Sequence, residues 1–571
     1  MKRAAIVIAI LLSAAGVAWL QTPAPAIDLA TLMPSGALLY LRAADFGRLL
    51  GDWDGSKVKH DWLASDNYAV FAQSNLFEKL SGVYREYSTT IGFAPGLRGI
   101  GEIAGTESAL ALYDIRELQF VYISRVGESQ LPKAQLWMAR NRFEQREAAG
   151  VPFWLRRDGA TGRTVGFAFA KGWLIVATRD DLIARALELL AGAHDPSVAS
   201  ERWYIDATAA AKSPGELRLE MNLETLTKSD YFRSYWLQRN VSDVKQYRTA
   251  VADLSRSGTE IHESRVLLRS SENPGSGPRA EDRSEAARLL ATAPDDAGLS
   301  RVWAAPNATA ASGLIIDKLI APPVQTSDFQ RYAPPSIDLA QTAGTEADLE
   351  TRIDEPPLPS DATLAESAAP LRIMIDKAGA RAMMVAQSTA PAGRTFIRTP
   401  CAIALAASSP WNEAEIESAL TQAIEPLWTT SGLGAGWQTG TGSVREMDGL
   451  GKLYIAVRGD VLYVANDAVM LAAMLNRADT APARGTSTYA AVLRAARERQ
   501  NYDRLMTALD FASPINETGY GLTASSTQTP AFFSQDIASL ARVLSPVTEI
   551  RISEEDNGAR VLQTVTYNWR R

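Results

Sequence analysis

The chain has 571 residues, more than one hydrophobic core normally supports, so we expect two or three domains. Hydrophobic residues make up 46% and charged residues 22%, which is typical of a folded globular protein and argues against disorder. The formal net charge of −7 lacks the basic surplus that binding to a phosphate backbone requires, so nucleic acid is not an expected partner.

The N-terminus has the pattern of an export signal. Lys2 and Arg3 precede the uncharged residues 4–20, and Ala24 and Ala26 are spaced as small residues at a cleavage site. We expect residues 1–26 to be a cleaved signal peptide. The alternative is an N-terminal anchor formed by residues 4–20, which are almost long enough to span a bilayer and would attach the protein to the membrane.

The cysteine count points to the same compartment. The chain has one cysteine, Cys401, so an intramolecular disulfide is excluded. Export without disulfides fits a bacterial periplasm or cell envelope better than a small secreted animal domain.

A segment of the first half returns in the second half. Residues 166–192 resemble residues 452–479, and each predicts a strand, a turn at a glycine, a second strand and an amphipathic helix. The glycines are Gly172 and Gly459, and each helix follows an aspartate, Asp180 or Asp467, that we interpret as a helix cap.

Further matching blocks in the same order predict two similar repeats. They span residues 27–275 and 288–571, joined by a linker at 276–287 that is rich in Gly, Pro, Ser and charge. The second repeat carries an insertion rich in proline and acidic residues near 322–368, for which the sequence shows no counterpart in the first.

The pattern of elements predicts an α+β fold with mainly antiparallel sheet and amphipathic helices. Consecutive hairpin-like strands carry this prediction, ending in a strong type I′ turn signal at Asn557-Gly558. We expect one helix to begin near Ser409 and Pro410, and another to end at Gly192.

The sequence singles out no catalytic, cofactor-binding or metal-ligating residue, and we predict no cofactor. His60, His194 and His262 lie far apart, without a second His or Cys at metal-ligand spacing. Cys401 lies in an apolar strand-like run, as expected for a buried cysteine. The glycine-rich residues 431–442 fail the dinucleotide-binding spacing, because Trp437 stands where a third glycine is needed.

Three blocks of the first half resemble exported bacterial proteins that carry a domain of unknown function. They are the Pro-led strand at 32–43, the Gly-led strand at 103–112 and the strand-to-helix segment at 170–187. The resemblance covers about half of the chain and implies an envelope location and an α+β architecture. It brings no catalytic residues, and the second half departs from it most.

Three hypotheses for function follow. The preferred one is non-enzymatic binding of a protein partner or an apolar ligand, which predicts an apolar cavity lined by inward faces of the sheets. The alternatives are a hydrolase that uses two carboxylates facing each other in a cleft, and a structural or assembly factor with an exposed apolar patch.

Overall fold

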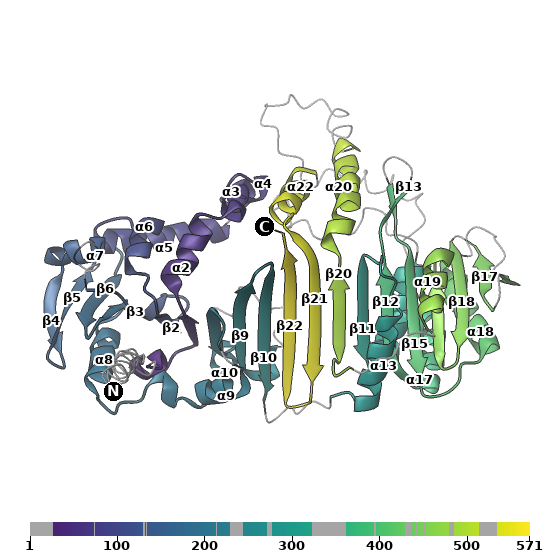
Figure 1. Cartoon of the computed structure of the whole chain (residues 1–571), viewed down its shortest axis with the longest axis horizontal. Helices are drawn as coiled ribbons and strands as arrows, with labels where there is room; N and C mark the ends of the chain where they lie inside the picture. Colours follow the sequence, from purple (N-terminus) through teal and green to yellow (C-terminus); the bar gives the residue numbers. More distant parts are fainter. Residues whose placement is uncertain are drawn as a thin grey trace, which may run out of the picture. The chain divides into compact units, whose positions relative to one another are not determined.

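The computed structural model describes residues 27–73, 75–128, 132, 134–212, 214–228, 244–270, 277–321, 361–392, 396–428, 436–440, 443–449, 451–478, 485–512 and 534–570 (Figure 1). The predicted export signal at 1–26 and most of the insertion at 322–368 lie outside these residues. The α+β prediction is confirmed, because antiparallel sheet and helices make up the fold.

The chain divides into two compact units. The first comprises Met1–Gly55 and Glu78–Val251, and the second comprises Ser56–Phe77 and Ala252–Arg571. This division differs from the predicted one, because the boundary falls within strand β9 (Tyr247–Ser257). Residues 280–287 of the predicted linker lie in helix α13 (Ala280–Ala291), whose Ala286 and Leu289 are buried.

Among the described residues, eight antiparallel strands form the sheet of the first unit. Their order is β8 (Leu217–Asn222), β1 (Leu39–Ala43), β2 (Ser108–Asp114), β3 (Gln119–Arg125), β7 (Trp173–Ala177), β6 (Thr164–Ala170), β5 (Val151–Arg157) and β4 (Glu144–Ala148). Helix α8 (Asp180–Ala191) packs on one face against Ile123 and Ile175. Helix α5 (Asn75–Ile91) contributes Ile91 to the core on the other face, with Phe167 and Leu174.

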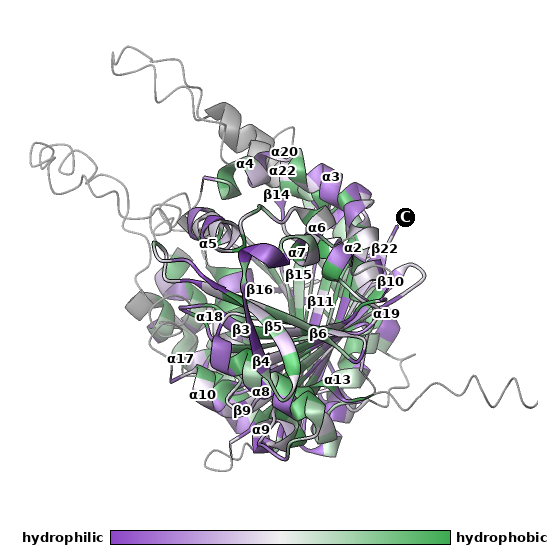
Figure 2. Ribbon diagram, turned by 90° about the vertical axis from the view of Figure 1, so that its left-hand side faces the viewer, coloured by the Kyte–Doolittle hydropathy of each residue, from purple (hydrophilic) through white to green (hydrophobic). Residues whose placement is uncertain are grey.

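Eleven antiparallel strands that follow β9 form the sheet of the second unit, again among the described residues, and β9 also pairs with β10. Their order is β10 (Glu260–Arg269), β22 (Arg560–Trp569), β21 (Val547–Asp556), β20 (Tyr489–Leu493), β11 (Leu299–Ala304), β12 (Ala380–Gln387), β15 (Cys401–Ala407), β19 (Val461–Ala465), β18 (Lys452–Arg458), β17 (Arg445–Asp448) and β16 (Trp437–Thr439). The side chains of the central strands β12, β15 and β19 are mainly hydrophobic and buried. Figure 2 colours the residues of the ribbon by hydropathy.

Helices cover both faces of this second sheet. Helices α14 (Ala308–Ile315), α17 (Asp361–Ala378) and α18 (Glu413–Trp428) pack on one face, while α13 and α19 (Ala468–Ala478) pack on the other. Strand alternation divides the side chains between these two cores, as in β15, where Ile403 faces α18 and Ala404 faces α19.

The two sheets share one order of strands. The series β8–β1–β2–β3–β7–β6–β5–β4 of the first unit corresponds to β20–β11–β12–β15–β19–β18–β17–β16 of the second. The segments compared in the sequence form equivalent hairpins followed by helices, β6–β7–α8 and β18–β19–α19.

The predicted insertion near 322–368 lies outside the described residues except for 361–368, which begin helix α17. It lies in the connection from β11 to β12, which contains α14 and α17. The equivalent connection from β1 to β2 is also long and contains helices α2 (Phe46–Asp54) to α6 (Leu97–Ile103).

The helix ends and caps predicted from the sequence agree with the structure in part. Gly192 ends α8 with a φ of 103°, as expected, and the Asp467 carboxylate caps α19 by accepting a hydrogen bond from the Met470 amide at 2.9 Å. Asp180, by contrast, is the first residue of α8 and not its cap. Helix α18 begins three residues later than Pro410 suggests, because Asn412 accepts hydrogen bonds from the amides that begin the helix.

The turn between β21 and β22 is not the predicted type I′ turn. Strand β21 ends at Asp556 and β22 begins at Arg560, so residues 557–559 connect them, and Gly558 has a positive φ of 87° whereas Asn557 does not. The Asn557 side chain instead accepts a hydrogen bond from the Arg560 amide at 2.9 Å.

Candidate functional site

The three histidines form no common site. His60 is exposed on α3 (Lys57–Leu63), and His194 is exposed after the end of α8. His262 lies on β10 with its Nε2 3.0 Å from the Glu260 carboxylate. Within the described residues, no three His, Cys, Asp or Glu side chains are grouped to hold a metal ion. No helix in the described ranges combines the length and apolar character needed to cross a membrane.

A cavity of about 370 Å³ lies within the first unit, and we call it the apolar pocket. Its volume falls within the range of small-molecule sites in proteins. The pocket is lined by Leu41, Ala43, Phe46, Ile100, Ile103, Ser108, Ala109, Leu110, Phe120, Tyr122, Val176 and Leu217.

The strands of the sheet supply the floor of the apolar pocket, and two helices supply its cover. Leu41 pairs with Leu110, and Leu110 pairs with Tyr122 on the next strand, so these side chains share one face. Phe46 of α2 and Ile103 of α6 close the pocket from above. The pocket therefore lies between a sheet and the helical connection from β1 to β2.

The two hydroxyls of the pocket are satisfied within the protein. The Tyr122 hydroxyl lies 3.2 Å from both the Ile103 carbonyl oxygen and Ser108 Oγ, and Ser108 Oγ lies 2.8 Å from Ser124 Oγ. Burial raises the pKa of Tyr122 above its ordinary value, so its hydroxyl keeps its proton at neutral pH. A bound molecule would therefore meet carbon surface rather than unpaired polar groups.

Gly105 fixes the end of the pocket cover to the sheet. Its amide donates to Ser124 Oγ at 2.8 Å, and its carbonyl accepts from the Gly47 amide at the start of α2 at 3.2 Å. A Cβ at residue 105 would overlap the Arg125 carbonyl oxygen and Ser124 Oγ. Only glycine allows this approach, which anchors α2 and α6 beside the pocket.

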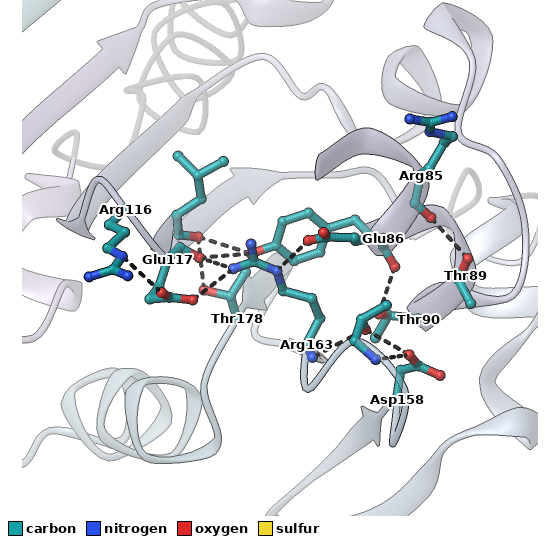
Figure 3. A network of polar contacts seen from close by, with 12 residues as sticks. Arg85, Glu86, Thr89, Thr90, Arg116, Glu117, Asp158, Arg163 and Thr178 are labelled. Atoms are coloured by element: carbon teal, nitrogen blue, oxygen red, sulfur yellow. Dashed lines mark hydrogen bonds and ion pairs between the residues drawn. The ribbon is translucent and has the colours of Figure 1, made fainter. Parts of the chain in front are cut away.

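A polar network around Arg163 holds α5 against the sheet next to the pocket (Figure 3). Arg163 Nε donates to Glu86 at 2.9 Å, and its guanidinium also reaches the Glu117 carbonyl oxygen. The Arg163 guanidinium lies over the Tyr87 ring, 5.5 Å from its centroid. That ring packs against Phe120, which lines the pocket, with centroids 6.3 Å apart.

A second cavity, of about 570 Å³, lies within the second unit, and we call it the charged cleft. It is found where β15 begins and β19 ends. The cleft is lined by Asp317, Lys318, Leu319, Ile320, Ala321, Gln387, Arg398, Thr399, Pro400, Cys401, Gly451, Lys452, Asn466, Asp467 and Tyr502.

Both carboxylates of the charged cleft contact a cation. Asp317 lies 2.7 Å from Lys318 Nζ, and Asp467 lies 3.3 Å from the Arg398 guanidinium. Asp467 also caps α19, so its position is set by the backbone. The helix cap gives the Asp467 carboxylate a structural role.

Cys401 forms part of the floor of the cleft and is only 2% exposed, as the sequence predicted for a buried cysteine. Burial raises the pKa of its thiol to about 12, and the positive charges of Lys318 and Arg301 offset this only in part. The thiol is therefore protonated at neutral pH and is a poor nucleophile.

Comparisons with known proteins identify no family. No family model matches the chain, and no curated protein matches it. Crystal forms I, III and IV of TP0453 are similar over 43% of this chain and 81–82% of that protein, with 11–12% identity. The TM-scores of these matches are 0.23–0.25, and they carry no inference about this chain.

The residues that line the apolar pocket carry no distinctive pattern in the sequence. Leu41, Leu110 and Val176 read as ordinary inward-facing strand residues, indistinguishable from those that fill a core. The one available signal was Gly105, because a glycine directly before a strand can mark close approach to a neighbouring backbone.

Proposed function

We propose that the protein is a non-enzymatic binding protein of the bacterial envelope, and that its first unit binds an apolar ligand. The observation that supports this proposal is the apolar pocket, whose walls are carbon surface and whose hydroxyls are already hydrogen-bonded. Contact with carbon surface is favourable for an apolar molecule at about 25 cal/mol per Å² removed from water.

The location forms part of the same proposal. Residues 1–26 carry the features of an export signal, and the single cysteine suits an envelope protein without disulfides. The mass of the mature protein from a bacterial envelope fraction tests this directly. A mass matching residues 27–571 supports cleavage, whereas a full-length mass supports the anchor alternative.

Binding is tested with N-phenyl-1-naphthylamine, a neutral apolar probe whose fluorescence rises in a dry site. We expect saturable binding to the wild-type chain. Leu110→Trp should abolish it, because the larger side chain fills the pocket from its floor. Val469→Trp is the matched control, since Val469 is 78% exposed on α19 in the other unit and should leave binding unchanged.

Two results would contradict the proposal. One is an absence of saturable probe fluorescence, and the other is equal binding by wild type and Leu110→Trp. Native mass spectrometry of the envelope-purified protein adds an independent readout. An extra mass that is lost on denaturation, and that is missing from Leu110→Trp, would carry the identity of the natural ligand.

A further inference from the structure

The first unit has Phe120 at the start of β3, and the second unit has Cys401 at the equivalent position at the start of β15. In the first unit, Thr178 follows β7 and its Oγ1 accepts a hydrogen bond from the Phe120 amide at 2.8 Å. In the second unit, Asn466 follows β19 and its Oδ1 accepts one from the Cys401 amide at 2.7 Å. The shared hydrogen bond places Phe120 and Cys401 at the same point of the fold.

The space beside this point is filled in the first unit. The Tyr87 ring packs on Phe120, the Arg163 guanidinium lies over that ring, and Glu86 and Glu117 contact the guanidinium. The first unit thus fills this position with an aromatic ring and a set of paired charges supplied by its own chain (Figure 3).

The same position is open in the second unit and forms the charged cleft. Cys401 is much smaller than phenylalanine and lies on the floor beside Pro400 and Ile320. The floor is therefore apolar, whereas charged side chains form the rim.

The charges that line the cleft favour an anion. Three cations line it, Lys318, Arg398 and Lys452, against the carboxylates of Asp317 and Asp467. Each of these cations already contacts a carboxylate, Lys318 with Asp317, Arg398 with Asp467 and Lys452 with Glu446 at 3.2 Å, so a bound anion would have to replace an existing partner. Arg398 is 64% exposed and Lys318 35% exposed, so both can turn to a bound anion at little cost in desolvation.

We propose that the charged cleft binds a small organic anion, with a carboxylate at the rim and an apolar or aromatic body on the floor. The carboxylate would replace the Asp467 oxygen as the partner of Arg398, while the other Asp467 oxygen keeps its cap on α19. The body would rest on Cys401 and Ile320, in the space that Tyr87 fills in the first unit. This inference does not depend on the apolar pocket.

Isothermal titration of the full mature chain with 4-phenylbutyrate tests this assignment, with 4-phenylbutan-1-ol as the uncharged analogue. We expect saturable binding of the acid. In the Leu110→Trp chain, whose apolar pocket is filled, we expect the alcohol to bind more weakly than the acid by roughly three- to tenfold, the range for loss of one partly exposed ion pair. Leu110→Trp should leave the affinity for the acid unchanged, which separates this site from the apolar pocket.

Two charge variants should change the affinity for 4-phenylbutyrate in opposite directions. Arg398→Gln should weaken binding by roughly threefold or more. Asp467→Asn should tighten it, because the amide keeps the helix cap while the competing negative charge is lost. Lys377→Gln is the matched control, since Lys377 pairs with Glu415 on the surface outside the cleft and should leave the affinity unchanged.

A filling variant completes the set. Cys401→Phe introduces the side chain found at the equivalent position of the first unit and should abolish binding; if that variant fails to fold, the charge variants decide. The inference is overturned if 4-phenylbutyrate shows no saturable binding up to about 10 mM, a concentration well above the Kd expected even of a weak site. It is also overturned if acid and alcohol bind the Leu110→Trp chain equally, or if neither charge variant changes the affinity.

Discussion

Substitution of Gly105 by alanine should separate the cover of the apolar pocket from the sheet. The added Cβ would overlap the Arg125 carbonyl oxygen and Ser124 Oγ. The carbonyl belongs to a strand paired on both sides, so it cannot move without disturbing β2 or β7. The connection that carries residue 105 must move instead.

The loss of stability comes from the overpacking and from the hydrogen bonds that this movement breaks. Overpacking at a site that cannot relax costs about 1–3 kcal/mol. Two hydrogen bonds are also lost, from the Gly105 amide to Ser124 and from the Gly47 amide to the Gly105 carbonyl, at about 1 kcal/mol each. We therefore expect a loss of about 3–5 kcal/mol in the stability of the first unit, together with loss of apolar-probe binding.

Native-state hydrogen exchange followed by mass spectrometry is the appropriate assay, because a chain with two units does not unfold in a single step. Amides of β2 and β3 should exchange faster in Gly105→Ala, while those of β12 and β15 should not change. Gly101→Ala is the control: Gly101 lies in α6 with open space around its Cβ position, so alanine should stabilise the helix by about 0.5–1 kcal/mol. Unchanged exchange in Gly105→Ala, or equal destabilisation by both variants, would refute the reasoning.

Three further predictions concern single side chains. Arg163→Ala should destabilise the first unit by about 2 kcal/mol, because the charged hydrogen bond to Glu86 is lost at a partly buried site, and native-state hydrogen exchange of the amides of that unit measures the change. Alkylation of Cys401 by iodoacetamide should stay slow at neutral pH and accelerate only as the pH approaches about 12, whereas the unfolded chain should react at ordinary thiol rates. Arg269 holds the pKa of Asp556 below its usual 3.8, so the stability from this pair is present above about pH 4 and falls as the pH drops further; unfolding of Asp556→Asn across this range should lack that part of the acid dependence.

The fold class could be predicted because it depends on local patterns. Strand alternation and turns such as those at Gly172 and Gly459 are determined by neighbouring residues, and both glycines have positive φ in the structure. The unit boundary could not be predicted in the same way. It depends on which residues pack together, and residues 56–77 pack with α22 (Ser534–Val543) of the second unit although they lie within the first half of the sequence.

The candidate sites were less accessible to sequence reasoning than the fold. A cavity depends on how several side chains pack around a space, so the identity of a single residue does not predict it. Leu110 would be a core residue if α2 and α6 lay closer to the sheet. Cys401 was correctly expected to be buried, but its position on the floor of a cleft depends on a size difference from Phe120 that appears only when the two sheets are matched strand by strand.

The shared strand order is what an internal duplication requires, and we retain duplication as a hypothesis. The two units differ in which side chains occupy equivalent positions on their sheets. In the second unit, Ile315, Leu371 and Leu420 from three helices pack onto the sheet face that corresponds to the apolar pocket, and each is at most 1% exposed. In the first unit, Tyr87 and Arg163 fill the position that corresponds to the charged cleft.

Each unit therefore closes the position that the other leaves open. Repeats that had kept one inherited function would be expected to keep their cavity at the same point of the sheet. Here the open space is lined by carbon surface in one unit and rimmed by charge in the other. The cavities differ because the helical connections differ, whereas the strands beneath them follow the same order. The two proposed sites therefore differ in the ligand chemistry that they would bind, although the order of the strands beneath them is shared.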